Sequence, residues 1–124
     1  MKLQESGEDY LEAILILKQE KGLVRAIDVA RHLDFSKPSV SRAVKLLRED
    51  GDLTVGKDGS LELTDKGREI AERIYERHRL LTLWFTELGV SEAQAAADAC
   101  RVEHDISAET FQKLKEHFGG SEKI

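Results

Sequence analysis

Three side chains with different donor atoms lie close together near the C-terminal end of the sequence. Glu103 and His104 lie three and four residues after Cys100. Such spacings place side chains on the same helix face as Cys100, with Cβ atoms roughly 5–6 Å apart. A thiol, a carboxylate and an imidazole that converge in this way can bind a transition metal. The alternative interpretation is that Cys100 is a small apolar packing residue and that His104 is an ordinary surface or core histidine.

Two carboxylates near the N-terminus, Asp9 and Glu12, repeat the three-residue spacing. Taken alone, they are best explained as a solvated acidic face that favours a helix N-terminus. His78 is a further candidate, because it lies between two arginines just before Leu80 and Leu81 and could face inward at that boundary. Two groups of possible metal donors therefore flank the middle of the chain.

Composition limits the class of protein. The chain has 124 residues, a net charge of −5 and a single cysteine, so one domain or two small ones are expected and an intramolecular disulfide is excluded. A reducing cytoplasm is the natural setting for such a chain. The N-terminus is polar and acidic, and the longest apolar run, Ala13 to Leu17, is far too short to span a bilayer. We therefore expect neither a signal peptide nor a membrane partner.

The spacing of apolar residues predicts a mainly α fold. Helices are expected over 9–20, with Ser6 as its N-cap, over 26–33, from Ser36 or Lys37 to a stop at Gly51, over 65–88, over 91–105, and from a Ser107 cap to a point before Gly119. Between residues 53 and 64 the period changes to two around Asp58-Gly59, which is a strong hairpin signal.

Two short helices joined by a tight turn and followed by a hairpin form the winged helix-turn-helix pattern, in which the second helix enters the major groove of DNA. No acid occurs between Ser36 and Arg48. We expect Arg42 to read a guanine edge, serines to reach bases or phosphates, Pro38 to touch a thymine methyl, and basic side chains to hold phosphates. The expected DNA-binding residues are Ser36, Lys37, Pro38, Ser39, Ser41, Arg42, Lys45 and Lys57. The alternative is a helix cap followed by a solvated basic face.

The chain also resembles a known family over residues 8–114. The segments that carry the resemblance are Ser36-Lys37-Pro38-Ser39-Val40-Ser41, Leu63-Thr64-Asp65-Lys66-Gly67, Arg77-His78-Arg79-Leu80-Leu81 and Ala99 to Ser107. Their order and spacing are similar to those of the diphtheria-toxin-repressor family of metal-dependent transcriptional repressors. The resemblance implies a winged helix-turn-helix DNA-binding domain over 1–70, followed by an all-helical metal-binding and dimerisation domain over 71–124.

The same resemblance implies a homodimer that binds a double-stranded operator when loaded with Fe²⁺ or Mn²⁺. Asp9 and Glu12 resemble the manganese-sensing branch of the family, whereas Cys100 resembles the iron-sensing branch. The iron branch also has an ancillary metal site, which uses a histidine aligned with His78. Its other helical ligands would fall at Thr82 and Ala96, which cannot bind a metal. His78 is therefore expected to join the main site, as in the manganese branch. The implied ligand set, which could hold one metal or a pair, is Asp9, Glu12, His78, Cys100, Glu103 and His104.

The expected function is thus a metal-dependent repressor of metal-ion homeostasis genes rather than an enzyme. Carboxylates suit Mn²⁺ and Fe²⁺, and a thiolate shifts the preference toward Fe²⁺, Co²⁺ or Zn²⁺, so the physiological metal stays open between Fe²⁺ and Mn²⁺, while Co²⁺, Ni²⁺ or Zn²⁺ could occupy the site in vitro. Two alternatives remain: a metal-independent winged-helix regulator and a small carboxylate-bridged metalloenzyme.

Overall fold

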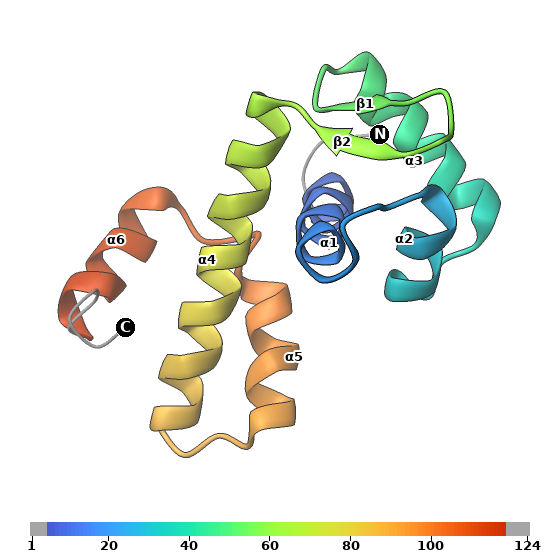
Figure 1. The fold of residues 1–124 in the computed structure, drawn as a ribbon. Helices are drawn as coiled ribbons and strands as arrows, with labels where there is room; N and C mark the ends of the chain where they lie inside the picture. The colour runs from blue at the N-terminus through green and yellow to red at the C-terminus, as the bar shows by residue number, and fades with distance from the viewer. Residues whose placement is uncertain (1–4, 119–124) are drawn as a thin grey trace. The chain divides into compact units, whose positions relative to one another are not determined.

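The computed structural model of the chain describes residues 5–118 (Figure 1). These residues form two compact units, which are divided between residues 73 and 74. The first unit contains α1 (Glu5–Lys21), α2 (Ala26–Leu33), α3 (Lys37–Glu49), β1 (Leu53–Val55) and β2 (Leu61–Leu63). The long helix α4 (Asp65–Glu87) begins in the first unit and ends in the second, which also contains α5 (Glu92–Val102) and α6 (Ala108–His117). The mainly α fold class is confirmed, and none of the described helices is long and apolar enough to span a bilayer.

The connection between α2 and α3 is a tight helix-turn-helix turn. Asp34 ends α2 in the left-handed conformation, with φ 59° and ψ 45°, which a short polar side chain tolerates better than most. Ser36 then caps α3, because its hydroxyl accepts a hydrogen bond from the Ser39 amide, and Pro38 occupies the first turn, where a missing N–H costs nothing. The expected cap and boundaries of α3 are confirmed. The helix α1 begins at Glu5, and the expected capping role of the Ser6 side chain lies outside the side chains that the structure describes.

The wing is an antiparallel hairpin that pairs Leu53 with Leu63 and Val55 with Leu61. Its inner side chains, Leu53 and Leu61, are each 1% exposed and anchor it to the core of the first unit. The Leu61 amide also donates to the Val24 carbonyl at 2.8 Å, which ties the second strand to the segment before α2. Backbone pairing and apolar burial therefore fix the base of the wing against the helices.

A close crossing joins the wing to the start of α4. The Asp52 carbonyl accepts a hydrogen bond from the Thr64 amide at 3.1 Å, and the Thr64 hydroxyl caps α4 by accepting from the Gly67 amide at 3.1 Å. A Cβ at Gly67 would lie 1.9 Å from the Asp52 carbonyl oxygen. Glycine is therefore required here by the approach of one backbone to another.

The second unit packs α4, α5 and α6 around one apolar cluster, made of Leu80, Leu81, Trp84, Ala99 and Phe111. Ala99 on α5 is 0% exposed and belongs to this cluster, and its small side chain allows α5 to lie close beside α4 (Figure 1). The Trp84 and Phe111 ring centroids are 5.8 Å apart, which attaches α6 to α4.

The helix expected over 91–105 ends at Val102, so the expectation that His104 continues it is wrong. Glu103 is the C-cap residue, and His104 lies in the following turn. The guanidinium of Arg77 donates to the carbonyls of Glu103 and Ile106, at 3.0 and 2.8 Å. The side chain thus satisfies carbonyl groups that a further helical turn would have used.

Replacing Gly67 by Ala should destabilise the protein by about 3 kcal/mol or more, because a backbone–backbone overlap cannot be relieved by moving a side chain. Urea unfolding followed by circular dichroism measures the change. Glu69→Ala, an exposed change on the same helix, is the control and should stay within about 0.5 kcal/mol. A Gly67→Ala variant as stable as this control would contradict the close crossing.

Hydrogen bonds from the Lys21 ammonium and the Arg25 amide lower the pKa of Asp28 from its ordinary value of 3.8. Because the folded pKa lies below the unfolded value, the ionised carboxylate stabilises the fold above that unfolded value, and the contribution disappears as pH falls through the folded pKa.

Asp28→Asn should therefore lower the free energy of unfolding by about 1 kcal/mol at pH 7, with the difference shrinking as the pH falls below 3.8. Urea unfolding at several pH values measures it. Glu20→Gln, an exposed change on α1, is the control and should show almost no difference. A gap that is independent of pH would contradict the role of the charge.

Candidate metal centre and nucleic-acid interface

The carboxylate of Glu103 is the centre of a polar cluster in the second unit. Its side chain is 0% exposed, and its Oε1 lies 2.9 Å from His78 Nδ1. Its Oε2 lies 3.4 Å from His104 Nε2, and the His104 side chain is 3% exposed. The short distance makes this contact a hydrogen bond between the imidazole nitrogen and the carboxylate oxygen. The side chains of α4 and of the turn after α5 thus bring one carboxylate and two imidazoles together.

This cluster fits a divalent metal. Glu103 Oε2 is buried and accepts no hydrogen bond from the residues that the structure describes, although burying an unpaired carboxylate oxygen is costly. Two imidazole nitrogens and a carboxylate form a mixed N/O donor set that suits Mn²⁺, Fe²⁺ and the later first-row ions. A bound cation would supply a positive charge beside this buried carboxylate.

The other expected ligands are divided between the two units. Asp9 and Glu12 lie on α1 in the first unit, three residues apart, and Glu12 is buried at 9% exposure. Cys100 lies on α5 in the second unit and is exposed, so it is not the buried packing residue of the alternative interpretation. Within the second unit, the geometry joins His78, Glu103 and His104.

Sequence reasoning missed Arg77, which is 7% exposed and donates a hydrogen bond to the backbone carbonyl of Glu103. The available signal was its position. Residue 77 falls three residues after Ile74 and four before Leu81, on the stripe of α4 that is otherwise apolar and buried. A charged residue on such a stripe needs partners, and here they include two carbonyls and an aromatic ring.

The first unit presents a basic surface at the beginning of α3. Most of the expected DNA-binding residues are exposed and Ser39 is half-buried; the exposed ones are Ser36, Lys37, Pro38, Ser41, Arg42, Lys45 and Lys57. Arg42 Nη2 lies 3.4 Å from the Ser39 hydroxyl, which orients the guanidinium along the first turns of α3. Lys37, Lys45 and Lys57 make no ion pair with any residue that the structure describes. Such cations are available to phosphates.

Arg25 holds the tip of the wing. Its Nε donates to the Asp58 carbonyl at 2.9 Å, and its guanidinium lies 3.9 Å from the Asp58 carboxylate. Hydrogen bonds from the Ser60 hydroxyl and amide lower the pKa of Asp58, so this acid stays ionised and bound into the turn. Lys57, the residue before Asp58, therefore lies in a turn that these contacts hold in place.

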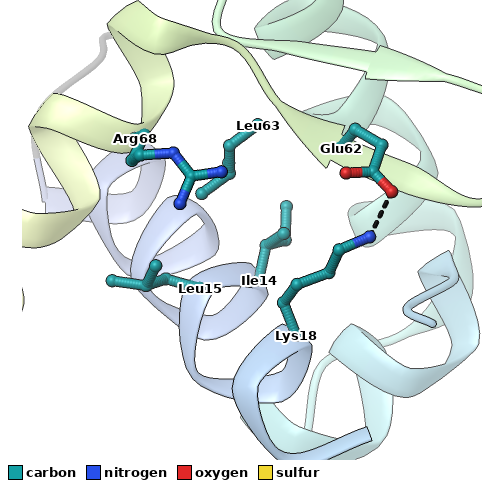
Figure 2. Close-up of a pocket in the computed structure, with 6 residues that line it drawn as sticks. All are labelled: Ile14, Leu15, Lys18, Glu62, Leu63 and Arg68. Carbon is teal, nitrogen blue, oxygen red and sulfur yellow. Dashed lines mark hydrogen bonds and ion pairs between the residues drawn. The ribbon is translucent and has the colours of Figure 1, made fainter. Parts of the chain in front are cut away.

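A small pocket lies elsewhere in the first unit, between α1, β2 and the first turns of α4 (Figure 2). Ile14, Leu15 and Leu63 are its apolar lining residues, and Lys18 pairs with Glu62 beside them (Figure 2). Arg68 completes the lining. None of the expected metal ligands or DNA-binding residues lines this pocket, so it belongs to neither candidate site.

A winged helix-turn-helix with a basic second helix, followed by a helical unit that carries a carboxylate–imidazole cluster, defines a DNA-binding regulator with a metal-binding unit. The comparisons agree. Residues 2–61 match the family described as "Iron dependent repressor, N-terminal DNA binding domain", and residues 64–123 match "Iron dependent repressor, metal binding and dimerisation domain". The chain therefore belongs to the iron-dependent repressor family of metal-dependent transcriptional repressors, and the metalloenzyme alternative is wrong.

Individual relatives support this membership. The HTH-type transcriptional regulator MntR of Geobacillus kaustophilus (strain HTA426) is 38% identical over 109 residues, which are 88% of this chain and 77% of that protein. The crystal structure of T. acidophilum IdeR matches with a TM-score of 0.78 and 28% identity, over 90% of this chain and 53% of that one. A manganese-dependent transcriptional repressor in complex with manganese matches with a TM-score of 0.82 and 27% identity, over 90% and 52%. The chain thus spans about half the length of these two solved chains.

Glu103→Gln should weaken Mn²⁺ binding at least tenfold, because an amide oxygen without charge replaces the central carboxylate. Isothermal titration calorimetry measures the affinity. Glu109→Gln, an exposed change in the first turn of α6, is the control and should leave it unchanged. Equal Mn²⁺ affinity in the two variants would remove Glu103 from the metal site.

Proposed function

We propose that this chain is an Fe²⁺- or Mn²⁺-activated repressor that binds an operator in double-stranded DNA as a homodimer and controls metal-ion homeostasis genes. The observation that carries the proposal is the buried Glu103 carboxylate. It lies between two imidazoles, and one of its oxygens has no hydrogen bond from any residue between 5 and 118. Family membership supports it, since one half of the chain matches a DNA-binding domain and the other a metal-binding and dimerisation domain. A cytoplasmic location is part of the proposal, because an exposed thiol suits a reducing compartment.

The proposed ligands include residues of both units. Asp9 and Glu12 supply carboxylates from α1, and His78, Glu103 and His104 supply the cluster of the second unit, with Cys100 as the one soft donor. When bound, the metal supplies a divalent charge that neutralises these carboxylates. The thiolate favours Fe²⁺ over Mn²⁺, and the carboxylates suit either ion. Because a bound thiolate must first lose its proton, a role for Cys100 makes metal affinity depend on pH near neutrality.

A metal that binds ligands from both units would favour one of the several arrangements that the two units can adopt without it. Binding energy then selects the arrangement that places the two recognition helices of a dimer at the operator spacing. Such a mechanism requires the metal to bind that arrangement more tightly than the others, by about 5.5 kcal/mol for a change in population from 1:99 to 99:1.

DNA binding by α3 would combine two kinds of contact. Arg42 and the serines at the start of the helix read base edges, whereas Lys37, Lys45 and the wing residue Lys57 hold phosphates. The total charge of −5 makes general affinity for DNA weak, so the local basic surface has to supply the attraction.

The experiment that tests the proposal has two steps. A duplex is selected from a random-sequence pool by the Mn²⁺-loaded protein, and its affinity is then measured by fluorescence anisotropy with and without Mn²⁺ or, under anaerobic conditions, Fe²⁺. Tighter binding with metal supports the proposal. Equal binding with metal and with a chelator favours a metal-independent regulator instead.

Arg42→Ala should weaken binding to the selected duplex by about 1–3 kcal/mol and reduce discrimination against a scrambled duplex. Lys45→Ala, a change on the same helix, is the matched control and should weaken binding to both duplexes about equally. Anisotropy titrations at one fixed salt concentration measure both. Undiminished discrimination by the Arg42 variant would exclude this residue from base readout.

A further inference from the structure

Glu103 is held by two consecutive residues of α4, one on its backbone and one on its side chain. Arg77 donates from Nη1 to the Glu103 carbonyl at 3.0 Å, and His78 contacts the Glu103 carboxylate at 2.9 Å. Both contacts link positions 25 or 26 residues apart in the chain. The Glu103 amide also donates to the Ala99 carbonyl of α5 at 2.9 Å, so Glu103 is held from α4 as well as from α5.

Arg77 itself is fixed from several directions. The same Nη1 also donates to the Ile106 carbonyl at 2.8 Å, so one guanidinium group bridges both sides of the turn that contains His104. On α6, the Phe111 ring centroid lies 5.4 Å from the guanidinium carbon, a cation–π distance. With 7% exposure, this side chain has little freedom to move.

We infer that Arg77 is a positioning residue for the metal centre: by fixing the turn over residues 103–106, it holds Glu103 and His104 where they can ligate the metal. This inference rests on the proposed function, because it assumes that Glu103 and His104 bind the ion. Glu103 ends its helix at this turn and would otherwise be free to shift, and groups that orient metal ligands commonly change metal affinity by a factor of 10 to 100 when they are replaced.

The position of the Arg77 guanidinium and its charge would have opposite effects on metal affinity, which makes the inference testable. A fixed guanidinium repels a cation, so if its charge were the main effect, Arg77→Met would tighten metal binding and Arg77→Lys would leave it unchanged. If positioning is the main effect, both variants weaken binding, since an ammonium cannot reproduce the planar fork of a guanidinium.

The experiment compares Arg77→Lys, Arg77→Met and the control Arg79→Lys, an exposed position two residues along the same helix. Mn²⁺ affinity is measured by calorimetry in the full chain, at a temperature where circular dichroism shows each variant to be folded. Arg77→Lys and Arg77→Met should each bind Mn²⁺ about tenfold or more weakly, and Arg79→Lys should bind like the unmodified protein. The Co²⁺ absorption spectrum should change in shape only in the Arg77 variants, because it reports ligand geometry, which general destabilisation of a folded protein leaves unaltered.

Two further variants keep the inference separate from the proposal beneath it. His78→Ala tests the site: if it leaves Mn²⁺ affinity unchanged, the proposed metal centre is wrong and the inference falls with it. If His78→Ala weakens binding while the Arg77 variants keep the original affinity and Co²⁺ spectrum, the inference alone is overturned. Should the Arg77 variants fail to fold, Phe111→Leu removes the ring behind the guanidinium; a several-fold loss of Mn²⁺ affinity would support the inference, and no loss would overturn it.

Discussion

The burial of the Glu103 carboxylate is the constraint on which the second unit depends. A carboxylate that is 0% exposed requires donors or cations around it, and α4 provides an imidazole at Oε1 and a guanidinium at the carbonyl of the same residue. The same guanidinium also donates to the Ile106 carbonyl, across the turn that follows the end of α5 at Val102 and carries His104. Apolar packing of Trp84, Ala99 and Phe111 keeps the three helices together around this polar centre.

The first unit depends on a constraint of another kind, a backbone crossing. At the crossing of Asp52 and Gly67, the end of the wing meets the first turn of α4 with no room for a Cβ atom. The side chain of Asp52 is 0% exposed, with Lys66 Nζ 3.4 Å from its Oδ1. The wing is thus fixed at its base by this crossing and at its tip by Arg25. Lys57 at the tip of the wing and the start of α3 both lie in this first unit.

Local signals made much of this fold predictable. Ser36, Pro38 and Gly51 mark the limits of α3, and Asp58-Gly59 marks the hairpin, because caps and turns depend on neighbouring residues only. Contacts between distant segments were not predictable in this way: the early end of α5 depends on a guanidinium from α4. For the site, spacing identified Glu103 and His104 as neighbours, but only the fold brings His78 to them. The metal-ligand role of all six residues, Asp9, Glu12, His78, Cys100, Glu103 and His104, stays a prediction.

The central claim is that metal binding and DNA binding are coupled, and coupling between two sites must be reciprocal. The most direct measurement is Mn²⁺ affinity by calorimetry, with and without a saturating operator duplex, compared with duplex affinity with and without saturating Mn²⁺. The account predicts that both affinities rise by the same factor, typically 5- to 150-fold for coupled sites. A Mn²⁺ affinity that is unchanged by the duplex would contradict it.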